Sequence, residues 1–233
     1  MEKDSIFDNI RDVFIRISRA AMKADREPTE VTLVAVTKTV GVGAIREAID
    51  AGLRVFGESR IQEAQRKVNS EELKVNGENI KWHLIGHLQR NKAKTAVALF
   101  DLIHSLDSID LALEINRQAE KIGKIQEVLI EVKLSAEETK HGISKDELPD
   151  FAAAVTGMTN LRLRGLMTVP PFLGNPGEAR PYFRELRELR EGTEALGVLL
   201  PELSMGMSDD FETAIEEGAT MVRVGTAIFG KRK

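Results

Sequence analysis

The sequence predicts an α/β protein in which eight parallel strands form a (β/α)8 barrel, preceded by one extra helix. Short β-branched runs alternate with helical stretches along the chain, and such alternation implies parallel strands joined by right-handed crossovers. Eight units suit a barrel, for which about 250 residues are typical, and the chain has 233. No linker or composition break divides it, so residues 1–233 are expected to form a single domain.

The first 24 residues predict an amphipathic helix that covers part of the barrel. Charges recur every few residues, so the segment does not resemble a signal peptide. Its apolar residues recur at helical spacing. They are Ile6, Ile10, Val13, Phe14, Ile17 and Ala21.

The remaining elements follow from the switch between strand-like and helix-like periodicity. Candidate strands cover residues 31–37, 54–56, 80–85, 100–104, 127–132, 161–167, 202–204 and 220–224. Candidate helices lie near residues 44–49, 58–68, 91–98, 108–122, 144–155, 179–195 and 209–217.

A doubly wound open sheet is the alternative architecture. Such a sheet usually carries a G-x-G-x-x-G turn after its first strand, with an acidic residue about 20 residues later. Here the first strand ends at Thr37-Lys38-Thr39, and the following Gly41 and Gly43 do not fit that pattern. The barrel is therefore the favoured interpretation.

Composition excludes several classes of function. The chain lacks cysteine, which rules out disulfides, thiolate metal centres and cysteine nucleophiles. Its net charge of −4 argues against sequence-independent binding of nucleic acid, because such binding needs a basic surface. No stretch approaches the roughly 18 apolar residues of a membrane span. No His/Asp/Glu spacing indicates a metal site, and we expect a cytoplasmic protein.

Lys38 is the most informative single residue. In a barrel of this kind the working face is the C-terminal end of the strands. Lys38 follows the first buried strand directly, so its ammonium is expected at the mouth of the barrel, where a Schiff-base lysine would act. The competing interpretation is a lysine that merely extends to water from a strand end.

Two loops after the seventh and eighth strands predict an anion site. They begin at Ser204 and at Arg223, and they supply small residues, Gly225 among them, and the hydroxyls of Ser204 and Thr226. Loops at these positions are the usual phosphate site of this fold, although glycines there also serve ordinary turns. An amine and a phosphate site together suit pyridoxal phosphate (PLP) or a sugar-phosphate aldehyde. With PLP, Arg223 has a natural place at the pyridine nitrogen.

Several segments, spread through almost the whole chain, resemble the PLP homeostasis protein family. They are LVAVTKT ending at Thr39, FGE ending at Glu58, WHLIGHLQRNK ending at Lys92, GLM ending at Met167, SMGMSD ending at Asp209 and RVGTAIFG ending at Gly230. The resemblance implies a barrel similar to the N-terminal domain of alanine racemase. It also implies a role in vitamin B6 and amino-acid homeostasis, with no established catalytic reaction.

The resemblance also implies roles for individual residues. Lys38 matches the lysine that holds PLP, Ser204, Gly225 and Thr226 match phosphate contacts, and Arg223 matches the arginine at the pyridine nitrogen. Two positions depart from the family pattern, because Ser59 and Lys133 stand where asparagine is more usual. Ser59 is shorter than asparagine, which bears on its contact with the PLP ring oxygen.

Three hypotheses for function remain open on these residues. A PLP carrier or buffer is favoured, with PLP-dependent apoenzymes as recipients and a monomer as the expected state. A small PLP racemase or lyase is the alternative, with His83, His87 or His104 as its base, because a racemase of the related barrel type needs a second base, usually a tyrosine from another domain. The single tyrosine, Tyr182, lies in a charged stretch that predicts an outer helix. A sugar-phosphate aldolase or isomerase using Lys38 is the third hypothesis.

Overall fold

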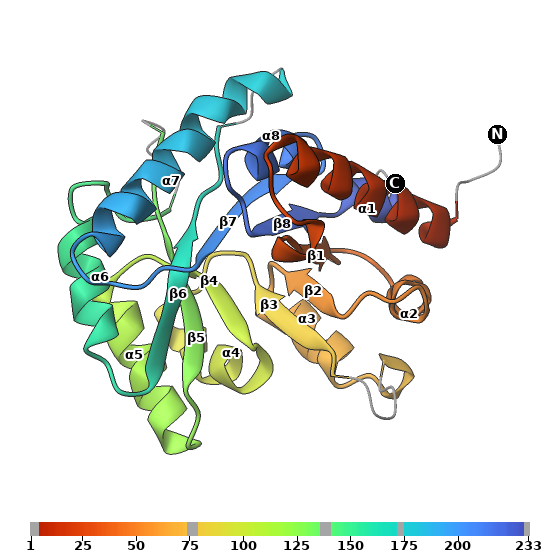
Figure 1. Ribbon diagram of the computed structural model, residues 1–233. Coiled ribbons are helices and arrows are strands. Elements are labelled where there is room, and N and C mark those ends of the chain that lie inside the picture. Colours follow the sequence, from red (N-terminus) through yellow and green to blue (C-terminus); the bar gives the residue numbers. More distant parts are fainter. Residues whose placement is uncertain (1–4, 74–78, 136–140, 172–174, 231–233) are drawn as a thin grey trace.

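Eight parallel strands close into a barrel in the computed structural model of the chain, as the sequence predicts (Figure 1). The structure describes residues 5–73, 79–135, 141–171 and 175–230. Each strand pairs with the next, and the last pairs with the first, which excludes the open doubly wound sheet. The strands are β1 (Thr32–Val36), β2 (Val55–Glu58), β3 (Lys81–Leu84), β4 (Leu102–Leu106), β5 (Gln126–Glu131), β6 (Leu161–Met167), β7 (Glu202–Met207) and β8 (Met221–Val224).

Helices surround the barrel and connect its strands (Figure 1). All the helical stretches expected from the sequence are confirmed within the described residues. The helices are α1 (Ile6–Lys23), α2 (Val42–Asp50), α3 (Ile61–Val68), α4 (Ala93–Leu99), α5 (Ile109–Lys121), α6 (Leu148–Thr156), α7 (Arg180–Glu194), α8 (Phe211–Glu216) and α9 (Thr226–Phe229). None of these helices, in the part of the chain that the structure describes, is long and apolar enough to cross a membrane.

Two helices begin later than the sequence predicts. Glu58 belongs to β2 rather than to the following helix, because its carboxylate is buried against Thr37 and Lys67. Ser144 starts a turn instead of α6, since its amide and its hydroxyl both donate hydrogen bonds to the carboxylate of Glu147. In both cases a side-chain contact competes with the helical conformation, and at Ser144 that contact is local.

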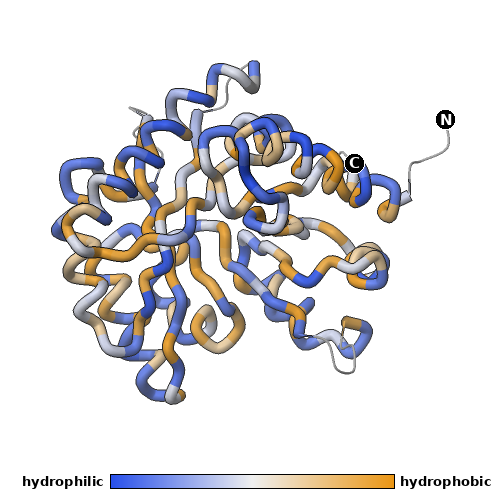
Figure 2. Tube along the Cα trace, viewed as in Figure 1, coloured by the Kyte–Doolittle hydropathy of each residue, from blue (hydrophilic) through white to orange (hydrophobic). Residues whose placement is uncertain are grey.

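Helix α1 packs against α8 and α9 and so covers the barrel beside β1 and β8 (Figure 1). Its first turn is capped by Ser5, whose hydroxyl accepts a hydrogen bond from the backbone N–H of Asp8 at 3.1 Å. In Figure 2 hydrophobic and hydrophilic segments alternate along α1, as an amphipathic helix requires. The buried side is Ile10, Val13, Ile17, Ala20 and Ala21.

The expected buried face of α1 is wrong at one position. Phe14 was expected against the core, but it is 46% exposed. It lies at the border of the buried stripe, and the exposed side of α1 also carries Phe7, Ile15 and Met22. The apolar spacing that predicts a helix therefore does not assign each apolar residue to the buried face.

The core has two parts. Most of the apolar side chains fill the space between the strands and the surrounding helices. A smaller cluster, contributed by strands on different sides of the barrel, fills its interior; it consists of Val34, Leu102, Leu129, Met167 and Met221. The interior also holds buried polar side chains, among them His83, His104, Ser204 and Arg223. Buried polar groups need hydrogen-bond partners, so their contacts define the candidate site.

Candidate functional site

Lys38 lies at the C-terminal end of β1, where the sequence places it. The strand ends at Val36, Thr37 is fully buried, and Lys38 is half-buried beyond it. Among the described residues, the Lys38 ammonium has no hydrogen bond or ion pair. A cation at a strand end without a carboxylate partner is available to a ligand.

A buried polar network holds the backbone on both sides of Lys38. Lys67 of α3 donates from Nζ to the carbonyl oxygen of Thr37 at 2.6 Å, to Glu58 Oε1 at 2.6 Å and to Glu63 Oε1 at 2.7 Å. Thr37 Oγ1 donates to the same Glu58 oxygen at 2.6 Å. The backbone N–H of Thr39 donates to Glu63 Oε1 at 2.6 Å. Lys38 therefore extends from a fixed segment of backbone.

The backbone after Lys38 adopts an unusual conformation. Thr39 has a φ of +65°, in the left-handed region that a β-branched residue rarely occupies. The hydrogen bond from its N–H to Glu63 helps to hold this turn. Burial raises the pKa of Glu58, against the opposing hydrogen bonds from Lys67 and Thr37. Strain and buried charge concentrated at one strand end are typical of functional sites.

The loop after β8 is the neighbour of Lys38 on the rim. Strands β1 and β8 pair in parallel, with Val34 opposite Arg223 and Ala35 opposite Val224. A Cβ added at Gly225 would stand 3.3 Å from the Cβ and the carbonyl oxygen of Val36, so this loop approaches the end of β1 closely. The register therefore puts Gly225 and Thr226 beside the segment that carries Lys38.

Backbone donors of this loop converge on an oxygen atom. Ser208 Oγ accepts hydrogen bonds from the N–H of Gly225 at 3.1 Å and from the N–H of Ala227 at 3.4 Å. Thr226, between them, is exposed. Two N–H groups that share one oxygen acceptor form a concave donor set suited to an anionic oxygen.

Ser204 lies within β7 inside the barrel, and not in a loop after that strand as the sequence predicts. Its side chain is fully buried inside the barrel, where its oxygen accepts a hydrogen bond from Arg223 Nη1 at 2.6 Å and lies 2.9 Å from His104 Nδ1. Ser208, at the end of the same segment, is instead the serine that contacts the Gly225 loop. Strand β7 extends to Met207, and this longer strand separates the two serines.

Arg223 is held inside the barrel by two oxygen acceptors. Besides Ser204, it donates from Nη2 to the carbonyl oxygen of Thr168 at 2.9 Å. Burial lowers its pKa to about 10, while the nearby Glu131 and Asp210 oppose the shift, so the guanidinium keeps its charge at neutral pH. The expected alternative, in which Arg223 only pairs with a barrel carboxylate, is not what these hydrogen bonds show.

A chain of hydrogen bonds continues from Arg223 across the barrel. Because the arginine donates to Ser204, the serine hydroxyl can donate to His104 Nδ1, and His104 Nε2 lies 3.0 Å from His83 Nδ1. Burial lowers the pKa of His83 to about 3 and that of His104 well below its usual value. Both imidazoles are therefore neutral, and His83 is confirmed as a hydrogen-bonded core residue.

Ser59 is half-buried directly after β2. It packs against Gly86, where an added Cβ would lie only 2.4 Å from the carbonyl oxygen of Ser59, so only glycine fits there. Ser59 also lines a cavity of about 260 Å³ at this end of the barrel. The other residues of that cavity are Arg60, Ile61, Gln62, His87, Gln89 and Lys92.

Comparison with known proteins identifies the family. The model of the alanine racemase N-terminal domain matches residues 15–233. A pyridoxal phosphate homeostasis protein of Aquifex aeolicus is 46% identical over 222 residues, which cover 95% of this chain and 96% of that protein. The protein of the same name from Escherichia coli K12 is 42% identical over 236 residues, covering 98% and 97%. The chain belongs to the pyridoxal phosphate homeostasis protein family.

Solved structures agree with this assignment. PipY of Synechococcus elongatus, solved with PLP bound, is 38% identical and superposes with a TM-score of 0.81, covering 92% of this chain and 100% of that chain. An alanine racemase of Clostridium difficile superposes with a TM-score of 0.72 at 16% identity, covering 97% of this chain but 57% of that chain. The second likeness shows the shared barrel fold alone.

Glu131 is a polar group at this end of the barrel that the sequence analysis missed. It is the last residue of β5, its Oε2 atom is buried without a hydrogen-bond partner, and burial raises the pKa of its carboxyl to about 7. The negative charge of Asp107 adds to the shift, and Arg223 opposes it. Its position at the C-terminal end of a predicted strand was the signal in the sequence that could have identified it as a candidate.

Replacing Glu131 with glutamine is predicted to change how the stability of this homeostasis-family protein depends on pH. The pKa of Glu131 is about 4.5 in the unfolded chain and about 7 in the folded one. The carboxyl therefore contributes fully to stability below pH 4.5, and this contribution is lost as the pH rises through 7. We therefore expect Glu131→Gln to raise the free energy of unfolding at pH 8 by roughly 2 kcal/mol relative to the wild type, and by little at pH 4.5.

Urea unfolding at the two pH values measures this difference. The control is Glu120→Gln, on the exposed side of α5, which removes the same charge from the surface. An equal gain for Glu131→Gln at both pH values would show that the carboxyl is not the titrating group.

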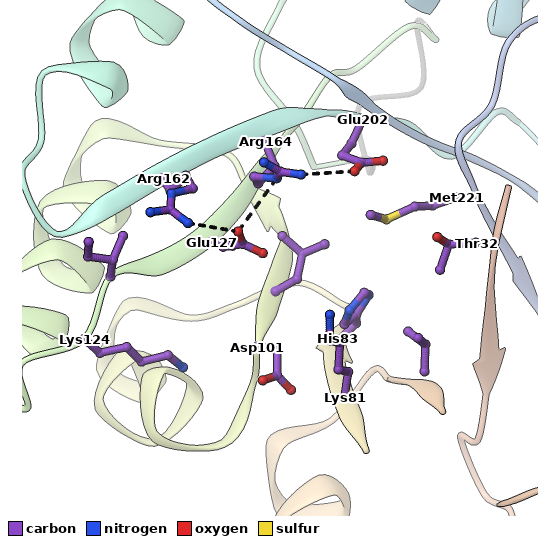
Figure 3. Close-up of a pocket in the computed structure, with 13 residues that line it drawn as sticks. Thr32, Lys81, His83, Asp101, Lys124, Glu127, Arg162, Arg164, Glu202 and Met221 are labelled. Atoms are coloured by element: carbon purple, nitrogen blue, oxygen red, sulfur yellow. Dashed lines mark hydrogen bonds and ion pairs between the residues drawn. The ribbon is translucent and has the colours of Figure 1, made fainter. Parts of the chain in front are cut away.

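A larger cavity lies at the opposite end of the barrel (Figure 3). It has a volume of about 410 Å³ and is lined by residues near the N-terminal ends of the strands. Its charged side chains engage each other, since Glu127 lies 3.6 Å from Arg162 and 3.8 Å from Arg164, which in turn lies 3.4 Å from Glu202. In this fold the N-terminal face contributes stability, so the candidate site of this family member is the rim that carries Lys38.

Proposed function

We propose that this chain binds PLP covalently through the amine of Lys38 and serves as a carrier or buffer of the cofactor in vitamin B6 and amino-acid homeostasis. The observation that carries the proposal is the Lys38 amine, which has no partner among the residues that the structure describes and extends from a fixed strand end beside the donor set at Gly225. PLP supplies an aldehyde that condenses with a primary amine and a phosphate that needs hydrogen-bond donors. The name and PLP complex of the relatives support the same ligand.

The Gly225 loop is proposed to hold the phosphate. Its backbone N–H groups already converge on the oxygen of Ser208, which shows that the loop fits an oxygen acceptor. Thr226 is exposed between them and adds a hydroxyl. Ser204 belongs to the site through Arg223, whose guanidinium it holds at 2.6 Å. Ser59, half-buried at the same end, is proposed to lie beside the ring of the cofactor.

Arg223 is proposed to donate a hydrogen bond to the pyridine nitrogen. Its guanidinium keeps its proton at neutral pH, because its pKa of about 10 lies well above 7. A donor at this nitrogen leaves the nitrogen unprotonated and limits the ring's capacity to accept electrons. This electrostatic arrangement favours holding the cofactor over transforming a substrate.

A racemase needs a second base, and Tyr182, His83 and His104 are poorly suited to that role. Tyr182 belongs to α7, which runs along the outside of the barrel (Figure 1). His83 and His104 are buried, neutral and hydrogen-bonded to each other. The carrier proposal includes PLP-dependent apoenzymes as recipients, and it treats the chain as a cytoplasmic monomer.

Three measurements test the proposed function. The chain mixed with PLP is expected to develop the visible absorbance band of lysine-bound PLP, and the loaded chain is expected to restore activity to a PLP-dependent apoenzyme. Amino acids incubated with the loaded chain in deuterated water are expected to keep their α-protons. Rapid exchange of those protons would favour the racemase, and failure to develop the band would contradict the proposal itself.

A further inference from the structure

Three loops on the rim bring two imidazoles and a carboxylate together. His87 follows β3, Asp107 follows β4 and His141 lies in the segment after β5. His87 Nδ1 lies 3.2 Å from Asp107 Oδ2, and His141 Nδ1 lies 4.0 Å from the same oxygen. One ligating atom from each of the three residues lies within 4.8 Å of the other two. The ring of His141 also stacks on that of His87, with centroids 3.7 Å apart.

The backbone fixes each of the three positions. His87 stands between Gly86, whose carbonyl oxygen accepts a hydrogen bond from Ser105, and the buried Leu88. Asp107 stands between the buried Leu106 and Ser108, which caps the first turn of α5. The first two loops are therefore anchored at the points where these side chains begin.

The third position is anchored to β5. Ile143 donates from its backbone N–H to the carbonyl oxygen of Glu131 and accepts from the N–H of Lys133, both at 2.9 Å. Gly142 has a φ of +116°, and an added Cβ there would lie 2.8 Å from the nitrogen of Lys133. Glycine is required for this close approach, and it positions the neighbouring His141 over the end of the strand.

We propose that His87, Asp107 and His141 form a binding site for a divalent transition-metal ion, with Zn²⁺ as the representative ion. Two imidazoles and one carboxylate are an established ligand set for zinc, with water completing a tetrahedron. Zinc bonds of about 2.0–2.2 Å place neighbouring ligand atoms about 3.3 Å apart. The 3.2 Å separation of His87 and Asp107 already meets this requirement, and His141 needs a small approach.

Metal binding requires one rearrangement that the structure permits. The two rings lie nearly parallel, with an interplanar angle of 10°, so one ion cannot lie in both ring planes at once. One imidazole must turn about its Cβ–Cγ bond, and His141 is the freer of the two, with 54% of its side chain exposed against 36% for His87. Asp107, only 13% exposed, is the preorganised ligand of the set.

The site lies next to the proposed cofactor site, since His87 lines the same cavity as Ser59, but it has its own ligands. It uses neither Lys38 nor the Gly225 loop, and it would stand if the chain bound no PLP. The nearby carboxylate of Asp110 does not belong to the cluster, because it is 77% exposed and lies 3.6 Å from Arg90. Asp110 therefore offers a matched control for Asp107.

Titration of Zn²⁺ into the untagged full-length chain, with and without PLP, tests the proposal by calorimetry. We expect one saturable site per chain in both states. Asp107→Asn and His141→Gln should each weaken binding roughly 100-fold or more, since even the partners of metal ligands contribute about 10–100-fold. Asp110→Asn should leave the affinity unchanged. Co²⁺ bound to the wild type should show the visible absorbance bands of tetrahedral nitrogen and oxygen coordination.

Three results would overturn this proposal. The first is a wild-type chain that takes up no Zn²⁺ at a single saturable site. The second is unchanged affinity in Asp107→Asn and His141→Gln when circular dichroism shows both variants folded, because the ion would then be held by other groups. Loss of binding in Asp110→Asn as well would assign the effect to surface charge rather than to ligation.

Discussion

Lys38→Ala is expected to abolish the absorbance band that develops when the wild-type chain is mixed with PLP, while the free energy of unfolding stays within about 0.5 kcal/mol of the wild type. The first effect follows because alanine has no amine to form the covalent bond. The second follows because the Lys38 ammonium has no hydrogen bond or ion pair with any described residue, so little stabilising interaction is lost. Absorbance spectra and urea unfolding measure the two effects separately.

Two control variants make this result specific. Lys38→Arg keeps the positive charge but provides no amine for condensation, so we expect it to lack the band too. Lys133→Ala removes another half-buried lysine, after β5, and should keep the band. A band that persists in Lys38→Ala would place the covalent bond on a different lysine.

Lys67→Met is expected to lower the free energy of unfolding by about 3–5 kcal/mol at pH 8. Methionine fills a similar volume but leaves the fully buried Glu58 carboxylate and the Thr37 carbonyl oxygen without their shared donor. Burial already raises the pKa of Glu58, and loss of Lys67 removes the main opposing interaction. The penalty should therefore be largest above the folded pKa of Glu58 and should shrink as the pH falls and the carboxyl takes up a proton.

Urea unfolding across this pH range tests the assignment of the penalty to an unpaired carboxylate. Arg66→Met, on the exposed side of the same helix, is the matched control and should change stability by less than about 0.5 kcal/mol. The double variant Lys67→Met with Glu58→Gln should recover part of the loss at pH 8, because it removes the unpaired charge. A loss in Lys67→Met that is independent of pH would instead point to a packing defect.

Regular alternation of strands and helices was enough to predict the barrel from the sequence. Every expected strand is present, since buried β-branched runs and amphipathic stretches have clearly different periods. One helix boundary was misplaced because a side chain contacts a residue distant in the sequence. Glu58 looked like the start of a helix because its partner Lys67 comes nine residues later.

Less of the candidate site could be predicted, because its contacts depend on the closure of the barrel. The position of Lys38 followed from local sequence, but its nearness to Gly225 depends on the pairing of β1 with β8. The hydroxyls of Ser204 and Ser208 look equivalent in the sequence, and only the length of β7 separates them. The residues His87, Asp107 and His141 come from three separate loops, so no spacing in the sequence brings them together.

Borohydride reduction of the PLP-loaded wild-type chain, followed by peptide mapping with mass spectrometry, tests the central claim most directly. Reduction fixes the cofactor on the lysine that held it. We expect the label on the single peptide that contains Lys38, at one cofactor per chain. A label on another lysine, or one spread over several surface lysines, would contradict the account.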